Sequence, residues 1–422
     1  MKVKINNFYI IIYFVLMILM NQSIGLSYIN LVSLLFLSVL LKNIKINRCL
    51  PTSIYFIYIS YAIIITVLNS GSGDISWYRI HINLCGLLIM CFLTSMFLTK
   101  QANIDLFCAR IRSFSWVLLI GGIFEYITKF NITRFMRNSD YVETYLDREG
   151  RILSIFYHPL GYAAFLLLLF ILFLYYPYKD YKKHFTINIL LITNLLFTKS
   201  RSALIILMFI WIIFKIKHLN KLSIRIPLKK IYGIIGAIIG LLVLITIFRN
   251  TISVFAISIY KRFMSLGIEN KEGIRTLIIL NFINYLKNSP FQYILFGHGI
   301  GYSYNFMKLY PITYRIDGKI NLWSQTTDNT YISIILDYGL VGFLIFVFLI
   351  ITIIKTFIFC KNKKVEMASL ILISLFILLF IMEGLYWPTI MFTYAFSFGI
   401  MEKTKSNNRS INKQGHRRKE II

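Results

Sequence analysis

The sequence predicts an all-α polytopic membrane protein, a helical bundle with about 12 transmembrane helices. Of its 422 residues, 58% are hydrophobic and only 15% are charged, whereas a soluble domain carries roughly 25% charged residues. The mean hydropathy is +0.70. Apolar runs long enough to cross a hydrocarbon core of about 30 Å recur along the chain. They lack the alternation of membrane strands, so helices are the expected spanning elements.

The apolar runs divide the chain into twelve candidate spans. These are 6–20, 24–41, 52–68, 80–99, 113–128, 158–176, 185–198, 202–216, 231–248, 331–358, 367–383 and 387–401. They predict one transmembrane domain, 1–401, followed by a basic tail at 402–422. The first run follows Lys2 and Lys4, as in a signal peptide, but Asn-Gln-Ser at 21–23 offers no small-residue cleavage site. An uncleaved first span is therefore expected.

The net charge of +28 predicts a topology rather than a nucleic-acid partner. With the N-terminus inside, 28 of the 45 lysines and arginines fall in cytoplasmic segments. Most of the others lie in two long loops, 129–157 and 249–330, which count little in the positive-inside rule. Both termini are therefore predicted to be cytoplasmic and both long loops extracytoplasmic. No cysteine then reaches the outer face and no metal-ligand spacing appears, so neither disulfides nor a metal site is expected.

The second long loop contains two further patterns. Ile274, Ile278, Phe282 and Leu286 repeat at i+4 within 273–288, which predicts an amphipathic helix lying on the outer membrane surface. The turn-rich FGHGIGYS at 296–303 predicts irregular backbone. Loops of this length usually carry function, so the outer face is expected to hold a small structured lid.

Polar residues near the span ends gather on the predicted outer side. They are Glu125, Arg151, His158, Arg201, Asp328, Asp337 and Glu383. An ion pathway would place titratable groups through the whole thickness of the membrane, so this one-sided pattern favours a site that opens outward. The alternative is that each is an interfacial anchor or a structural pair.

Four segments between residues 125 and 342, about half of the chain, resemble O-antigen polymerases and ligases. GRILSIFYHPLGYAAF at 150–165 is similar to their Arg and His-Pro segment, and FTKSRSALIIL at 197–207 to their Ser-Arg hairpin. LFGHGIGYS, and then TTDNTYISIILDYGLVGF at 326–343, resemble the end of their periplasmic loop and the span that follows. Ligases typically show His-Asn where this chain has Asp328-Asn329. The whole therefore looks most like a Wzy-type O-antigen polymerase.

The resemblance implies glycosyl transfer between undecaprenyl-pyrophosphate carriers at the outer face of the bacterial inner membrane, beside a chain-length co-polymerase. Arginine suits a departing pyrophosphate because its planar fork binds oxyanions with two hydrogen bonds. Asp328 or His158 would take the proton of the acceptor hydroxyl, and the chemistry requires no cofactor. The substrate-binding set that it implies is Arg151, Arg201, Arg275, His298 and Asn329.

Structural roles remain open for the same residues. His158 precedes Pro159 and could cap a helix, and Asp328 could be an N-cap or turn residue. Glu125, Asp337 and Glu383 are expected to orient the arginines. Two other functions remain: a ligase that transfers the glycan to lipid A-core, and a flippase for the same lipid-linked sugars. A flippase usually shows repeated halves, which this sequence lacks.

Overall fold

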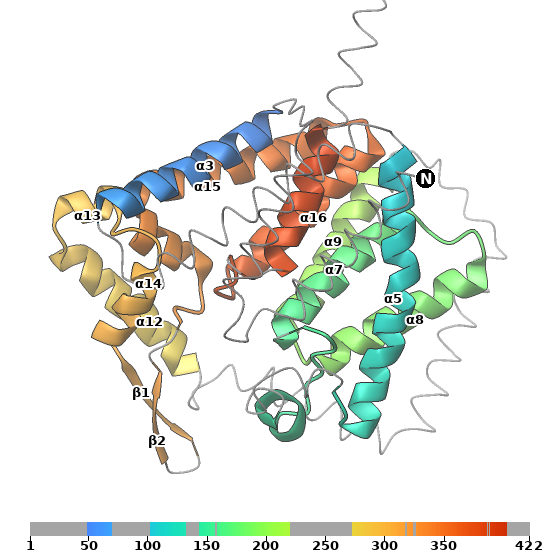
Figure 1. Cartoon of the computed structure of the whole chain (residues 1–422), viewed down its shortest axis with the longest axis horizontal. Coiled ribbons are helices and arrows are strands. Elements are labelled where there is room, and N and C mark those ends of the chain that lie inside the picture. The colour runs from blue at the N-terminus through green and yellow to red at the C-terminus, as the bar shows by residue number, and fades with distance from the viewer. Residues whose placement is uncertain are drawn as a thin grey trace, which may run out of the picture.

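The computed structural model describes residues 49–69, 102–131, 143–156, 158–219, 272–316, 319–323, 326–385, 387 and 389–402. Long apolar helices dominate this part of the chain (Figure 1). The bundle helices are α3 (Leu50–Leu68), α5 (Ala102–Thr128), α7 (Pro159–Tyr175), α8 (Tyr181–Phe197), α9 (Arg201–Leu219), α15 (Thr330–Phe359), α16 (Lys363–Leu379) and a helical stretch at 389–402. A short π-helix, η2 (Glu143–Arg148), lies between α5 and α7.

The observed helices match the predicted spans over the described residues. Each predicted span from 52–68, 113–128, 158–176, 185–198, 202–216, 331–358, 367–383 and 387–401 falls on a helix. Leu50–Leu68, Ile104–Thr128 and Thr330–Phe359 are long and apolar enough to cross a membrane, and α7 is a shorter apolar helix. The predicted spans 6–20, 24–41, 80–99 and 231–248 lie outside the described residues, as does the tail beyond Glu402.

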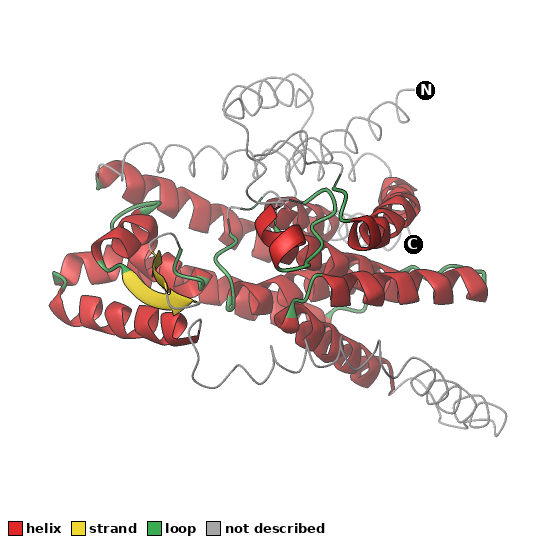
Figure 2. Ribbon diagram, turned by 90° about the horizontal axis from the view of Figure 1, so that it is seen from below, coloured by secondary structure: helices red, strands yellow, loops and turns green. Residues whose placement is uncertain are grey.

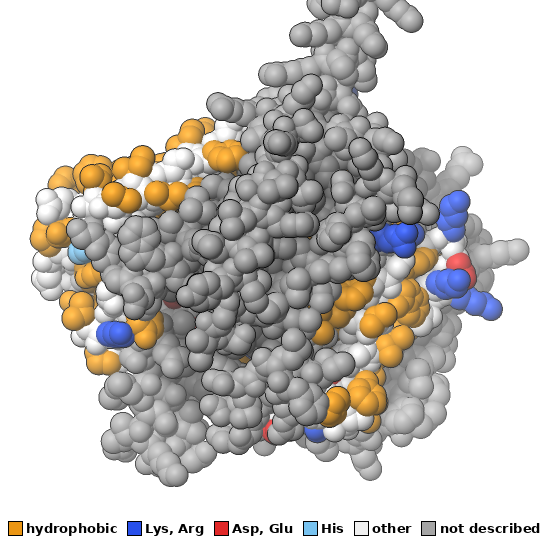
Figure 3. All heavy atoms as spheres, viewed as in Figure 1, with side chains coloured by type: hydrophobic (Ala, Val, Ile, Leu, Met, Phe, Trp, Pro, Cys, Tyr) orange, Lys and Arg blue, Asp and Glu red, His pale blue; other side chains and the backbone are white. Residues whose placement is uncertain are grey.

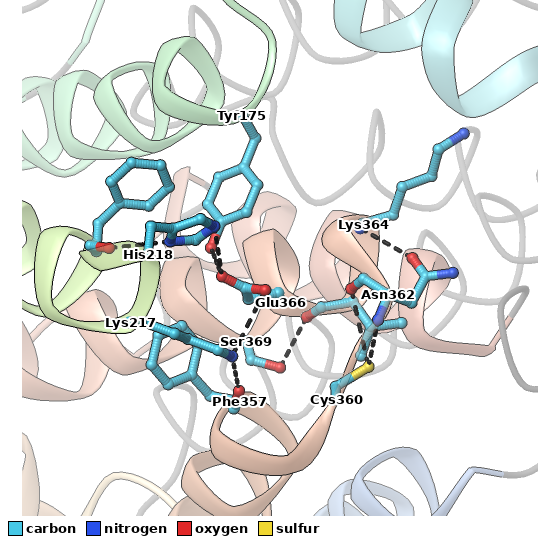
Figure 4. A network of polar contacts seen from close by, with 11 residues as sticks. Tyr175, Lys217, His218, Phe357, Cys360, Asn362, Lys364, Glu366 and Ser369 are labelled. Carbon is cyan, nitrogen blue, oxygen red and sulfur yellow. Dashed lines mark hydrogen bonds and ion pairs between the residues drawn. The ribbon is translucent and has the colours of Figure 1, made fainter. Parts of the chain in front are cut away.

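A polar cluster joins the end of α7, the end of α9 and the start of α16 (Figure 4). The Tyr175 hydroxyl donates to Glu366 Oε1 at 2.6 Å. Lys217 Nζ and His218 Nε2 lie 3.5 and 3.6 Å from the Glu366 carboxylate. Because a buried carboxylate is costly without partners, the cluster fixes these three helices against one another. We call this side of the bundle the Glu366 end.

Bundle helices that follow one another without a masked span between them, such as α7, α8 and α9, run in opposite directions, so their termini gather at two ends. Lys364 Nζ pairs with Asp105 at 2.8 Å, which brings the start of α5 to the Glu366 end. The Cys49 amide donates to Glu402 at 2.5 Å, which brings the start of α3 beside the end of the 389–402 helix. The α8–α9 turn lies at the opposite side, which we call the Arg151 end. This alternation is what a multi-span bundle requires; that the Arg151 end faces outward remains a prediction.

The contact between α5 and α8 depends on a buried amide. Asn194 on α8 donates to the Leu119 carbonyl of α5 at 2.9 Å and accepts from the Tyr162 hydroxyl of α7 at 2.9 Å. Gly122 faces this amide, and a Cβ added there would overlap Asn194 Oδ1 and lie 2.9 Å from the Tyr162 hydroxyl. Gly121, its neighbour, has no heavy atom within 4 Å of the corresponding position.

Gly122→Ala is therefore expected to destabilise the bundle by about 1–3 kcal/mol, the usual cost of overpacking a filled site. Asn194 cannot retreat without losing its hydrogen bonds. Gly121→Ala is the matched control, and it should be neutral or stabilising because alanine favours helix. Thermal unfolding of the purified proteins in detergent tests the pair. Equal melting temperatures for the two variants would contradict this account of the α5–α8 contact.

Helix α15 is broken at Gly339, which has φ +65° and ψ −172°. A break frees the carbonyls that precede it, and a buried carbonyl needs a donor. The Leu336 carbonyl accepts from the His298 amide at 3.2 Å, and the Asp337 carbonyl accepts from the Gly299 amide at 2.8 Å. The FGHGIGYS loop thus supplies the donors that the interrupted helix lacks.

The segment before α15 is structured, and we call it the lid; that it lies on the outer face remains a prediction. Its elements are α12 (Glu272–Asn288), α13 (Phe291–Phe296), α14 (Tyr302–Leu309), β1 (Ile312–Ile316) and β2 (Lys319–Trp323). The two strands pair antiparallel, with Ile312 opposite Trp323. This hairpin is the exception, among the described elements, to the predicted all-α architecture. Figure 2, turned by 90°, shows the yellow strands at the edge of the red bundle.

The apolar stripe predicted on α12 faces the lid rather than the membrane. Ile278 and Phe282 are buried together with Phe306 of α14 and Leu336 of α15. The stripe closes a small core of its own, separate from the core of the bundle. The prediction that this stripe lies on the membrane is therefore wrong at Ile278 and Phe282, because the sequence pattern could not distinguish lipid from a protein core.

Candidate functional site

The irregular segment before α7 docks on the α8–α9 turn at the Arg151 end. Arg151 Nε donates to the Thr198 carbonyl at 2.9 Å, and the Ile152 amide donates to the Phe197 carbonyl at 3.2 Å. Arg151 also pairs with Glu149 at 3.1 Å. Lys199 in the turn donates to the Glu149 carbonyl at 2.6 Å. These contacts bring the predicted Arg151 segment beside the turn that precedes Arg201.

Arg201 is the first residue of α9. The N-terminus of a helix carries partial positive charge, so a cation there opposes the helix dipole and favours a nearby anion. No acidic residue lies in the first turn of α9. Arg201, Lys199 and Arg151 therefore lie around one turn, with the Glu149 carboxylate beside Arg151. The helix dipole does not favour a cation at Arg201, so the dipole does not account for this residue.

Glu125 at the end of α5 organises the backbone beside this turn. Its carboxylate accepts from the Leu153 amide at 3.0 Å and from the Ser154 amide at 2.6 Å. Asn131 Nδ2 donates to it at 2.8 Å. Ser154 has φ +53°, which a side-chain-bearing residue seldom adopts. Glu125 thus fixes the bend between Arg151 and α7; its predicted role as an arginine partner remains a prediction.

His158 precedes the first residue of α7 and caps that helix. Its Nδ1 accepts from the Leu160 amide at 3.0 Å, as the capping interpretation expected. Its ring lies between Tyr145, with centroids 4.6 Å apart, and Trp387, at 5.1 Å. Because Nδ1 accepts the bond from the Leu160 amide, the proton of the neutral ring is on Nε2. The only lone pair of the imidazole is therefore engaged in the cap, which makes His158 a poor general base.

Asp328 lies in a constrained turn before α15. It has φ +51°, in the left-handed region, and its Oδ1 accepts from the Thr326 hydroxyl at 2.9 Å. Asn329 is the N-cap of α15, since its Oδ1 accepts from the Tyr331 amide at 2.9 Å. The capping role considered for Asp328 therefore belongs to Asn329. Unusual backbone conformations of this kind concentrate at functional sites.

A segment after α16 holds the Asp328 turn in place. Glu383 Oε2 accepts from the Thr327 amide at 2.9 Å, and the Met382 carbonyl accepts from the Thr330 hydroxyl at 2.7 Å. Trp387, a few residues later, contacts the His158 ring. The segment from Met382 to Trp387 therefore links the Asp328 turn to His158. Glu383 supports the turn backbone, a role that the sequence did not distinguish from pairing with arginine.

His298 lies within a stack of aromatic rings in the lid. Its ring is parallel to Tyr293 at 4.1 Å and to Tyr302 at 3.7 Å, and its Nε2 lies 2.7 Å from the Tyr285 hydroxyl. Burial lowers the pKa of His298 to about 4. Asp337 accepts from the Gly301 and Ser303 amides (3.1 and 2.7 Å) and fixes the loop that follows.

The depressed pKa of His298 predicts a dependence of stability on pH. A histidine that is harder to protonate when folded stabilises the fold fully above its unfolded pKa near 6.5, and this contribution is lost as the pH falls towards 4. His298→Phe keeps a ring in the stack but removes the titrating group, so its melting temperature should fall less between pH 7 and pH 5 than that of the wild type. Parallel pH dependences for the two proteins would contradict this assignment.

The comparison with known families agrees with this geometry. Residues 186–347 match a family described as O-Antigen ligase. The match supports the O-antigen ligase/polymerase superfamily and fits O-antigen-related glycan processing at a membrane. It contains Arg201, His298 and Asp328 but not Arg151 or His158. A search of curated proteins gave no match.

The structure separates the predicted site residues into two groups. Arg151 and His158 share the Tyr145 ring, with the Arg151 guanidinium carbon 5.7 Å from its centroid. Arg201 follows the α8–α9 turn that Arg151 contacts. The Asp328 turn is held by Glu383, and Trp387, a few residues later, contacts the His158 ring. His298 lies beside the break in α15, far along that helix from Asp328. Arg275 lies on α12, and the structure does not describe its side chain.

Sequence reasoning missed three contributors to this end of the bundle. Lys199 stands next to the Ser-Arg motif and could have been found from that spacing. Tyr145 and Trp387 carried no local signal, because aromatic residues are common throughout this chain. Their positions next to His158 depend on tertiary contacts alone.

Proposed function

We propose that this protein polymerises oligosaccharide repeat units linked to undecaprenyl pyrophosphate, at the outer face of the bacterial inner membrane. The growing glycan is the donor, and the sugar of a new lipid-linked unit is the acceptor. A chain-length co-polymerase is the expected partner. The observation that carries the proposal is that Arg151, Lys199 and Arg201 come together around the α8–α9 turn, at one end of the bundle.

The chemistry requires charge stabilisation and a base. An acceptor hydroxyl oxygen attacks the anomeric carbon of the donor, and the bond from that carbon to the pyrophosphate oxygen breaks. Pyrophosphate leaves with the bonding electrons and with negative charge, which fixed guanidinium groups stabilise. Arg201 is assigned this role, with Arg151 holding the turn beside it.

Asp328 is assigned as the base that takes the acceptor proton. An aspartate carboxylate can accept a proton, whereas the Nδ1 of His158 is engaged in capping α7. The Asn329 cap and the Thr327–Glu383 bond hold the turn from both sides. This support is what a positioned base needs, because misplacement costs rate.

A ligase is the second candidate, favoured by the description of the matched family. It would share the donor and the departing pyrophosphate but would use lipid A-core as the acceptor. The Asp328-Asn329 pair, in place of the His-Asn typical of ligases, is the reason for preferring polymerisation.

Purified protein incubated with purified lipid-linked repeat unit tests the proposal. A ladder of carrier-linked polymers is expected. Deletion of the coding sequence gives the cellular counterpart: lipopolysaccharide with single repeat units indicates a polymerase, whereas loss of surface glycan with carrier-linked polymer retained indicates a ligase. Absence of a ladder together with that second phenotype would replace the proposal by the ligase.

A further inference from the structure

Helix α13 exposes its apolar side chains although it lies between the bundle and the lid core. None of its residues is buried, and Phe291 and Phe296 are 72% and 45% exposed. The helix carries no charged side chain. In water, two exposed phenylalanines on one short uncharged helix would be an aggregation hazard or a binding surface.

The depth of α13 follows from the two spans that it touches. After the break at Gly339, the limb of α15 from Leu340 to Phe359 rises about 30 Å at 1.5 Å per residue, which matches the hydrocarbon core. Gly297, directly after α13, lies against the Gly339 backbone. Asn69, directly after α3, donates to the Gly297 carbonyl at 2.9 Å. The end of α3 and the break in α15 therefore lie beside the end of α13.

The exposed face of α13 continues the lipid-facing surface of these spans. Ile64 and Leu68 of α3 and Leu344 of α15 are exposed apolar residues. The Tyr61 hydroxyl of α3 lies 3.4 Å from the Phe296 carbonyl, so α13 extends this surface directly. Figure 3 shows the hydrophobic side chains running over α3 to the edge of the molecule where α13 lies.

We propose that α13 is inserted into the acyl-chain region of the lipid leaflet at the Arg151 end and anchors the lid there through Phe291 and Phe296. Lipid is the occupant that this surface fits, because the surface is apolar, uncharged and continuous with membrane spans. The membrane contact that the sequence assigned to the α12 stripe then belongs to α13. On the proposed function, this anchor holds the His298 loop at the depth of the carrier headgroup.

Photocrosslinking of the full-length protein in native membranes tests the anchor. Benzoylphenylalanine is placed singly at Phe291, at Phe296, at Ile64 on α3 as the positive control, and at Leu309 at the hairpin end of the lid as the matched exposed residue. Leu309 is 65% exposed, similar to Phe291. After irradiation, phospholipid adducts are measured by mass spectrometry. We expect adducts at Phe291, Phe296 and Ile64 and none at Leu309.

Three outcomes would overturn the proposal. Adducts at Ile64 without adducts at Phe291 and Phe296 would place α13 outside the membrane. Adducts at all four positions would assign the contact to the whole lid rather than to α13. Adducts between Phe291 and another protein would identify the surface as a protein interface. None of these results depends on which glycan reaction the protein performs.

A pair of variants measures the contribution of the anchor to turnover. Phe291→Asp places a charge in the acyl region and should lower polymerisation roughly tenfold or more while the protein still inserts. Leu309→Asp should leave polymerisation unchanged within about twofold. Equal effects of the two substitutions would contradict the anchor, and a failure of the wild type to polymerise would concern the proposed function alone.

Discussion

Asp328→Asn should lower polymerisation by about 100-fold or more, the usual contribution of a positioned general base. The substitution keeps the size of the side chain and a carbonyl that can accept from Thr326, but it removes the basic oxygen. Asparagine tolerates the left-handed conformation at least as well as aspartate does, so the turn should keep its shape. Turnover of purified lipid-linked repeat units is the measurement, with substrate binding measured separately.

The matched control for this variant lies at the opposite end of the bundle. Asp180 is the N-cap of α8 and accepts from the Lys182 amide at 2.9 Å. Asparagine caps about as well as aspartate, so Asp180→Asn should be active. Full activity of Asp328→Asn would show that Asp328 is not the base and that leaving-group stabilisation carries the reaction.

Arg201→Lys should lower turnover by about 10- to 100-fold while membrane insertion persists. Lysine keeps the charge but loses the planar fork that binds two oxygens of a pyrophosphate at once. The effect is expected in kcat more than in KM, because the negative charge grows as the pyrophosphate departs. Steady-state kinetics on lipid-linked repeat units separate the two parameters.

Two further arginine variants are needed to interpret the Arg201→Lys result. Arg110 is exposed near the start of α5, so Arg110→Lys should retain full turnover. Arg151→Lys should lose the bonds to Thr198 and Glu149 and so disturb the turn, with a reduction in both stability and turnover. If Arg201→Lys and Arg151→Lys both polymerise normally, the pyrophosphate role is wrong.

The described helices could be predicted because burial in lipid imposes a long, uniform apolar signal. The exact start of α5 and the break in α15 could not be predicted, because both depend on contacts with other elements of the fold. Gly339 adopts its conformation where the lid loop supplies donors to the freed carbonyls. The β-hairpin did carry a local signal, Asp317-Gly318 between two alternating runs, which the helical reading of the chain overlooked.

The site was predictable in residue type but not in role. Asp328 and Asn329 are both good N-caps, so only the observed bond from Asn329 Oδ1 shows which one caps α15. Similarly, the sequence placed His158 at the outer side, but its burial and its contact with Trp387 depend on the segment after α16. Chemistry that depends on pKa needs this tertiary information.

The interrupted helix also determines whether the lid is an autonomous folding unit. The amides of His298 and Gly299 take their acceptors from α15, and the Ile300 amide takes its acceptor from Thr66 of α3. A lid excised as a soluble fragment would lose all three acceptors together with the surface against which Gly297 packs. The described part of the long loop, from α12 onward, is therefore expected to unfold together with α3 and α15 rather than on its own.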